Sequence, residues 1–192
     1  MLLRWVSALL IGYLLGSVQV ARVVARRHGV ELDRAGDRNP GYWNAREQLG
    51  RRRSVPVFVG DVAKGALAAA VGLVLVTDSV WGIAYVAVAG AMLGHAWPVF
   101  AGFRGGRSVL TFVGGAAVLC PGAALVSLAA CVVVALVTRS FAWGARVGVF
   151  GFPLAQFLFD TPNRVAATGA LMSIIGLRFL MAARSERTAR TT

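Results

Sequence analysis

The chain has 192 residues, a formal net charge of +12 and a mean hydropathy of +0.69. Its hydrophobic share is 57% and only 15% of its residues are charged, against about a quarter in ordinary soluble domains. The apolar residues form long runs, which excludes an ordinary soluble domain. A charge this basic would suit nucleic acid or an anionic membrane surface, and the hydropathy favours the membrane, so we expect no nucleic-acid partner.

The first apolar segment, 2–21, has Arg4 ahead of an apolar core, as a secretory signal peptide does. No small-x-small cleavage pattern follows it, and many more apolar segments do, so we interpret it as a transmembrane helix. A spanning helix needs about 20 residues. The predicted spans are 2–21, 55–77, 79–101, 109–121, 122–138, 144–160 and 163–183.

The stretch 109–138 decides the number of helices. It is too long for one span and short for two, and Pro121–Gly122 in its middle is a turn signal. We expect two short or tilted helices, which gives seven spans; six is the alternative. The predicted fold is therefore all-α, a polytopic integral membrane protein with one domain, residues 1–192.

Lysine and arginine are distributed unequally between the two sides of this topology. Eighteen of the twenty fall on the side of the loop 22–54, with Lys64 just inside the second span, and only Arg4 and Arg164 fall on the opposite side. The positive-inside rule then places the N-terminus outside and the C-terminus in the cytoplasm, which requires an odd number of spans. The opposite turns are short: 77–79, 121–122 and 160–164. We therefore expect the chemistry at the cytoplasmic face.

The first cytoplasmic loop contains an unusual run, Gly36-Asp37-Arg38-Asn39-Pro40-Gly41-Tyr42-Trp43-Asn44. Glycines beside Asn and Pro make a tight backbone, which can direct successive N–H groups at an anion. Nearby arginines can help to hold a phosphate. A plain structured connection between helices would explain the same run.

The second such loop follows Gly94-His95-Ala96-Trp97-Pro98-Val99-Phe100. A Gly105–Gly106 turn lies between Arg104 and Arg107, and Ser108 can cap the next helix. Basic side chains on a turn at a helix N-terminus suit an anionic group. An interfacial aromatic belt with positive-inside arginines explains the pattern as well, and His95 alone is as compatible with packing as with function.

Asp61 and Lys64 are ionisable residues within a predicted span. Three residues apart, they share one helix face and can pair. Such residues are costly in a membrane and therefore indicate function, unless both lie near the interface, where Lys64 could extend its charge to water. Cys120 and Cys131 lie in apolar runs, and we interpret them as reduced packing residues. No metal-binding cluster is evident in the sequence.

These motifs occur in a specific order along residues 10–115. They are Tyr13-Leu14-Leu15-Gly16-Ser17, Gly29-Val30, Asn39-Pro40-Gly41-x-x-Asn44, Leu49-Gly50, Asp61-x-x-Lys64-Gly65, Gly94-His95-x-x-Pro98-Val99-Phe100 and Phe103-Arg104-Gly105-Gly106-Arg107-x-Val109-x-Thr111. Each motif is short, but the ordered set resembles the acyl-phosphate:glycerol-3-phosphate acyltransferase family of PlsY type.

The resemblance implies a seven-helix enzyme of the bacterial plasma membrane with its active site at the cytoplasmic face. Such an enzyme transfers a fatty acyl group from acyl phosphate to glycerol 3-phosphate. The product is lysophosphatidic acid, an intermediate of phospholipid biosynthesis. The family uses no metal or cofactor and forms no acyl-enzyme. The implied partners are the lipid bilayer and the two substrates, and the oligomeric state stays open.

The resemblance also implies roles for individual residues. The expected catalytic residues are Asn39, Asn44, His95 and Arg107. The expected substrate- and phosphate-binding residues are Arg38, Gly41, Asp61, Lys64, Arg104, Gly105, Gly106, Ser108 and Thr111. Backbone N–H groups around Gly41 and the Gly105–Gly106 turn would bind phosphate beside the arginines, and His95 would be a structural or orienting residue.

The chain departs from the family pattern in the first loop and the last helix. Asp37 and Arg38 replace Ser and Gly, Tyr42–Trp43 replaces Ala-Thr, and Glu47 replaces Arg. The segment 179–183 offers neither the His nor the Asn that is usual there. The alternative function is therefore a catalytically impaired relative that binds an anionic lipid or a partner protein on the same scaffold.

Overall fold

The computed structural model describes residues 1–76 and 80–191, and every regular element in that part is a helix. The predicted turn 77–79 lies outside the described residues. The helices are α1 (Leu2–Ser17), α2 (Val20–Arg27), α3 (Tyr42–Leu49), α4 (Arg51–Leu75), α5 (Gly82–Ala96), η1 (Val99–Ala101), α6 (Val109–Leu119), α7 (Pro121–Thr138), α8 (Phe141–Gln156) and α9 (Pro162–Thr191). Helices suit such apolar segments because they satisfy their backbone hydrogen bonds internally.

Each predicted span falls on a helix, but the helices differ in length. Within the described residues, 5 are long and apolar enough to cross a membrane: Leu2–Arg27, Arg51–Leu75, Gly82–Ala101, Pro121–Thr138 and Pro162–Ser185. The first of these joins α1 and α2 across the short break at Val18 and Gln19. α6 has 11 residues and α8 has 16, below the length of a full straight span.

The stretch 109–138 forms two helices, as predicted. Cys120 leaves the helical conformation at φ −143° and ψ 82° and ends α6. Pro121 then begins α7 at a position where its missing N–H costs nothing. Both cysteines are free, with Cys120 buried and Cys131 partly buried.

Small residues bring α1 and α5 into direct backbone contact. A Cβ on Gly16 would lie 2.0 Å from the carbonyl oxygen of Ala91, and one on Gly94 would lie 2.1 Å from that of Tyr13. Close approach through small residues is a standard way for membrane helices to associate. The Tyr13 hydroxyl donates to the carbonyl of Trp97 at 2.7 Å and so fixes the end of α5 that leads into the glycine-rich turn.

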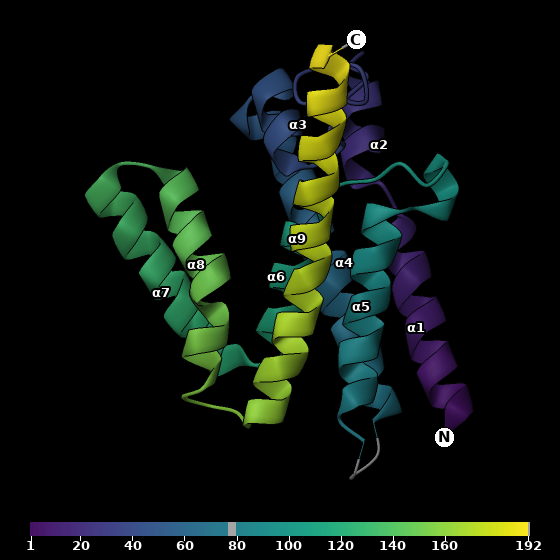
Figure 1. The fold of residues 1–192 in the computed structure, drawn as a ribbon, viewed down its shortest axis with the longest axis vertical. Helices are drawn as coiled ribbons and strands as arrows, with labels where there is room; N and C mark the ends of the chain where they lie inside the picture. The colour runs from purple at the N-terminus through teal and green to yellow at the C-terminus, as the bar shows by residue number, and fades with distance from the viewer. Residues whose placement is uncertain (77–79, 192) are drawn as a thin grey trace.

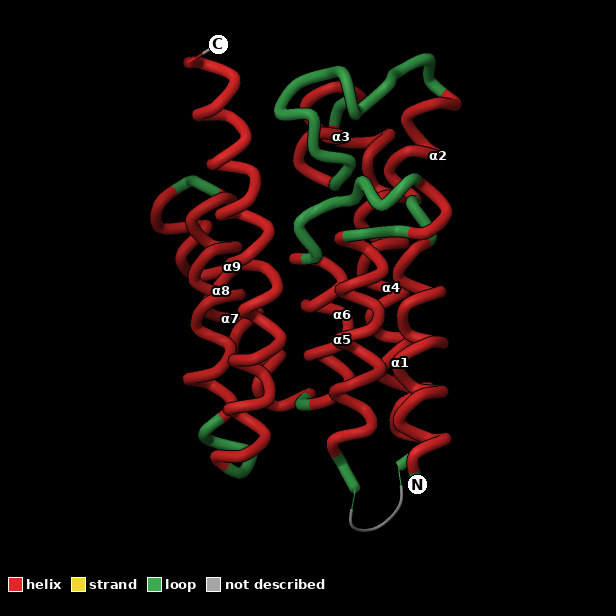
Figure 2. The backbone as a smooth tube through the Cα atoms, turned by 45° about the vertical axis from the view of Figure 1, so that its right-hand side comes forward, coloured by secondary structure: helices red, strands yellow, loops and turns green. Residues whose placement is uncertain are grey.

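The polar loops and the C-terminus collect at one end of the molecule. Figure 1 shows α2, α3 and the end of α9 together there, with the N-terminus and the α8–α9 turn at the opposite end. In Figure 2 the long loops at that end lie over the tops of the helices. The hairpin of α7 and α8 stands beside the bundle, and its large apolar residues, such as Leu125, Leu136 and Val137, are exposed. Such a surface suits contact with lipid.

Candidate functional site

A cavity of about 290 Å³ lies between the loop after α2, the glycine-rich turn and α9. Its lining residues are Asp37, Arg38, Asn39, Gly105, Arg107, Arg178, Met181, Ala182 and Ser185. Three of them are arginines and one is a carboxylate, so the cavity carries an excess of positive charge. Four of the predicted site residues, Arg38, Asn39, Gly105 and Arg107, are thus brought together from two distant loops.

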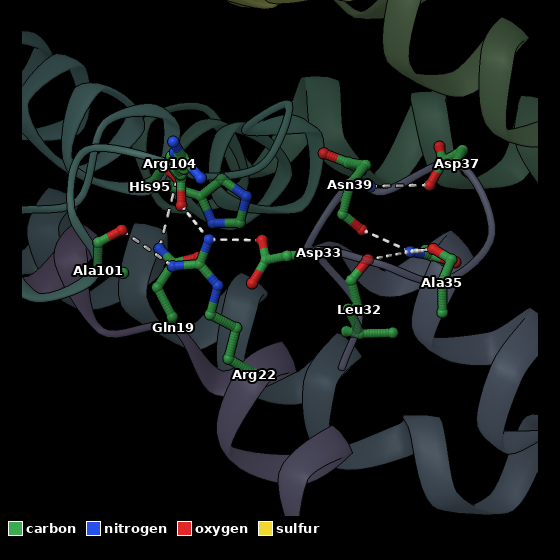
Figure 3. Close-up of polar contacts among 12 residues, drawn as sticks. Gln19, Arg22, Leu32, Asp33, Ala35, Asp37, Asn39, His95, Ala101 and Arg104 are labelled. Carbon is green, nitrogen blue, oxygen red and sulfur yellow. Dashed lines mark hydrogen bonds and ion pairs between the residues drawn. The ribbon is translucent and has the colours of Figure 1, made fainter. Parts of the chain in front are cut away.

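Asn44 holds the first loop in shape. Its buried Nδ2 donates to the carbonyls of Leu32 at 3.1 Å, Ala35 at 2.9 Å and Asn39 at 3.1 Å (Figure 3). The loop passes Asn44 so closely that Gly36, at φ +57°, has no room for a side chain. The Nδ2 group is engaged with the loop, Oδ1 is buried without a hydrogen-bond partner among the described residues, and Asn44 does not line the cavity. Asn44 therefore shapes the loop, and its expected role in orienting a substrate stays a prediction.

Asp37 joins the two loops across the cavity. Its Oδ1 accepts the backbone N–H of Asn39 at 3.1 Å (Figure 3), and its Oδ2 pairs with Nη1 of Arg107 at 3.1 Å. Arg38, the next residue, has a left-handed backbone with φ +57°. Asp37 therefore neutralises the charge of Arg107. Glu47 is exposed and does not line the cavity.

The Gly105–Gly106 turn packs against His95 and leaves no room for side chains. A Cβ on Gly105 would lie 2.0 Å from the His95 carbonyl oxygen, and one on Gly106 would lie 2.2 Å from His95 Nε2. The N–H of Gly106 donates to that carbonyl at 3.0 Å, and the N–H of Gly41 donates to the Asn39 carbonyl at 2.8 Å. These two N–H groups donate to carbonyls of the protein itself. The backbone phosphate cradle around Gly41 and the Gly105–Gly106 turn stays a prediction.

Arg178 on α9 fixes the same turn from the other side. Its Nη2 donates to the carbonyl of Gly105 at 2.7 Å and its Nε to that of Gly106 at 3.1 Å. Its guanidinium lies 5.1 Å from the centre of the Trp97 ring, and the neighbouring Phe179 ring lies 4.8 Å from the guanidinium of Arg107. The sequence analysis missed Arg178 as a site residue, although an arginine within an apolar span was a usable signal.

Asp61 and Lys64 form the predicted pair, with 2.8 Å between Lys64 Nζ and Asp61 Oδ1. Both are almost fully buried, at 3% and 5% side-chain exposure, and Lys64 also donates to the Val18 carbonyl at 3.1 Å. Lys64 therefore does not extend its charge to water. His95 Nδ1 lies 3.6 Å from Asp61 Oδ1. This cluster packs behind the glycine-rich turn and does not line the cavity, and the expected roles of the three residues stay a prediction.

Ser108, Thr111 and Arg104 also lie outside the cavity lining. The Ser108 hydroxyl donates to the Met92 carbonyl at 2.7 Å. It makes no hydrogen bond to the N-terminus of α6, so the expected side-chain cap does not form. Ser108 instead connects α6 to α5. Thr111 is fully buried against α4, where its carbonyl meets Gly65. Arg104 is exposed.

Arg22 ties α2 to the loop around η1. It pairs with Asp33 at 2.7 Å and donates to the carbonyls of Ala101, at 3.3 Å, and Arg104 (Figure 3). The side chain is about nine-tenths buried. Hydrogen-bonded ion pairs of this kind hold a fixed geometry, so Arg22 keeps the two site-forming loops in register.

Comparison with known proteins identifies the family of this chain. A sequence profile described as Glycerol-3-phosphate acyltransferase matches residues 6–190. The chain belongs to the glycerol-3-phosphate acyltransferase family.

Individual relatives extend over most of the chain. The glycerol-3-phosphate acyltransferase of Neisseria gonorrhoeae FA 1090 is 35% identical over 181 residues, covering 90% of this chain and 88% of the relative. That of Rubrobacter xylanophilus is 37% identical over 161 residues, covering 82% and 78%. A crystal structure of the integral membrane acyltransferase PlsY in its glycerol 3-phosphate form is 27% identical, with a TM-score of 0.81 and coverage of 97% and 93%. A lysophosphatidic acid form gives a TM-score of 0.79 at 28% identity.

The two bulky departures from the family pattern lie away from the cavity. The Tyr42 ring packs edge-on against Phe58 of α4 at 5.3 Å, and the Trp43 ring lies 5.7 Å from Phe141 of α8. Arg46 covers Trp43 at 5.2 Å. These aromatic residues therefore anchor α3 to its neighbours. In this member of the family they leave the cavity open.

Proposed function

We propose that this chain transfers a fatty acyl group from acyl phosphate to glycerol 3-phosphate at the cavity between Arg38, Arg107 and Arg178. The observation that carries the proposal is the cavity itself, where three arginines and Asn39 meet from three separate segments of a chain in this family. Both substrates carry a phosphate, and arginine is well suited to bind one through paired N–H groups. The product is lysophosphatidic acid.

The reaction needs positioning and charge stabilisation more than a covalent intermediate. The acceptor hydroxyl oxygen forms a bond with the acyl carbon, the bond from that carbon to the phosphate oxygen breaks, and the phosphate leaves with the electron pair. The hydroxyl proton ends on the departing phosphate. Arg107 stabilises the negative charge that develops on the phosphate side. No group on the chain has to be acylated.

We also propose seven spans, with the N-terminus outside, the C-terminus in the cytoplasm and the cavity facing the cytoplasm of a bacterial cell. The polar loops that line the cavity and the arginines of the α7–α8 turn lie at the end of the molecule where α9 ends (Figure 1). Arg4 and Arg164 lie in helices that begin at the opposite end. This asymmetry supports the orientation because positive loops stay in the cytoplasm.

The test is phosphate release from palmitoyl phosphate with glycerol 3-phosphate, using the purified full chain in lipid. We expect Arg107→Ala to lower kcat/KM by about 100-fold or more, as removal of one charge-stabilising group does in other enzymes. Arg146→Ala is the control: this arginine is exposed on α8, stacks on Trp143 at 4.8 Å and lies outside the cavity. It should behave as wild type.

The absence of turnover from folded wild-type protein would refute the enzyme function and favour the alternative of a binding relative. Equal turnover by the Arg107 and Arg146 variants would instead show that the reaction does not take place at this cavity.

A further inference from the structure

The guanidinium of Arg178 has binding capacity that the turn does not use. It carries five N–H donors, and the bonds to the carbonyls of Gly105 and Gly106 involve Nε and Nη2. Trp97 covers the guanidinium on one side, 5.1 Å away. Arg178 also lines the cavity together with Arg107. Within the residues that the structure describes, the remaining donors are therefore available at the wall where an anion would bind.

The charges around Arg178 are not balanced. In the part of the chain that the structure describes, the cavity wall holds Arg38, Arg107, Arg178 and one carboxylate, Asp37, which pairs with Arg107. Arg178 is partly buried and bonds to neutral carbonyls. A partly buried cation without a counter-charge favours the binding of an anion. A phosphomonoester, with two negative charges, would offset this excess.

We propose that Arg178 is the second arginine of a two-arginine phosphate site, which it completes from the last helix while it holds the Gly105–Gly106 turn in place. One guanidinium serves both purposes. Its bonds to the two glycine carbonyls orient it, its remaining donors face the anion, and the turn carries Arg107 beside them. Arg178 directly precedes the segment 179–183, which lacks the His and Asn of the family pattern. The assignment of the phosphate to a reaction substrate depends on the proposed function; the binding of phosphate does not.

The test compares Arg178→Ala, Arg178→Lys and the control Arg146→Ala in the purified full chain. Arg146 is a matched control because it also stacks on a tryptophan but lies outside the cavity. The melting temperature is measured with inorganic phosphate and with glycerol 3-phosphate at low salt, since a ligand stabilises the state that binds it. Wild type and Arg146→Ala should be stabilised by both. Arg178→Ala should lose this shift, and Arg178→Lys should keep only part because a lysine cannot form the fork.

Steady-state kinetics then identify which of the two substrates places its phosphate in this site. In Arg178→Ala, KM should rise at least tenfold for one substrate, glycerol 3-phosphate or palmitoyl phosphate, and less for the other. A structural loss alone would lower kcat and leave the phosphate-induced shift of the remaining folded protein intact.

The proposal is overturned if neither phosphate compound stabilises wild type, or if Arg178→Ala shows the same shift as Arg146→Ala. Should Arg178→Ala fail to fold, Arg178→Lys decides, and a wild-type shift in that variant overturns the proposal. If phosphate raises the melting temperature only when Arg178 is present, but the wild-type protein shows no turnover, the phosphate site is upheld and the acyltransferase function is refuted.

Discussion

Asp37 and Arg107 form an ion pair in the wall of the cavity. The carboxylate, 34% exposed, holds the arginine at 3.1 Å, and both line the wall where a phosphate would bind. An anionic substrate therefore has to compete with Asp37 for Arg107, and the negative charge of Asp37 also repels the substrate. The arginines Arg38 and Arg178 offset this repulsion, which explains how a carboxylate can be tolerated at a phosphate site.

Asp37→Ser is expected to lower KM for glycerol 3-phosphate about fivefold, which corresponds to about 1 kcal/mol, because it removes the competing charge and frees Arg107. The measurement is the dependence of phosphate release on glycerol 3-phosphate concentration at constant ionic strength. Glu47→Gln is the matched control, since Glu47 is an exposed carboxylate outside the cavity lining. A higher KM in Asp37→Ser would mean that the carboxylate supports the site rather than opposing the substrate.

At the scale of elements, the contact of α1 with α5 positions one of the two site loops. Gly16 and Gly94 allow the backbones to touch, and the Tyr13–Trp97 bond holds the end of α5 where His95 supports the glycine-rich turn. If α1 and α5 moved apart, His95 would shift, and the glycine-rich turn that lines the cavity would shift with it.

Gly16→Ala is expected to destabilise the protein by about 1–3 kcal/mol, because the new methyl group would meet the Ala91 carbonyl oxygen at 2.0 Å and force the helices apart. The measurement is thermal unfolding of the purified protein in detergent. Gly176→Ala on α9 provides the comparison, since a Cβ there meets nothing within 4 Å. If both variants unfold at the same temperature, the close contact of α1 with α5 does not limit stability.

At the scale of the whole molecule, the two ends differ in both structure and charge. The loop after α2, the glycine-rich turn and the α7–α8 turn lie at the end where α9 terminates, and the short α8–α9 turn lies at the other (Figure 1). A cytoplasmic location of the first end would give water-soluble glycerol 3-phosphate access to the cavity while the apolar helices stay in the bilayer.

Cysteine labelling tests this orientation. In a background where Cys120 and Cys131 are replaced by alanine, Thr161→Cys should react with a membrane-impermeant maleimide on intact cells, since Thr161 is exposed in the α8–α9 turn. Arg34→Cys, in the exposed loop after α2, should react only after the membrane is opened. The reverse pattern would place the cavity outside and contradict the proposed topology.

Much of the architecture could be predicted from the sequence because the signals are local. Long apolar runs and the Pro121 break depend only on neighbouring residues, and they correctly indicated the helices, including the division of 109–138. The ordered loop motifs likewise pointed to the acyltransferase family, and Arg38, Asn39, Gly105 and Arg107 do line one cavity.

Only the tertiary structure decided which polar residues face that cavity. Asn44 looked like a substrate ligand but binds three loop carbonyls, and Asp61 and Lys64 pair behind the turn. Arg178, 71 residues from Arg107 along the chain, enters the cavity wall from the last helix. Sequence by itself determined the membrane character, the helices and the family, because each follows from local pattern. The direction of a side chain depends on which distant helix packs against it, and this is set only when the bundle has formed.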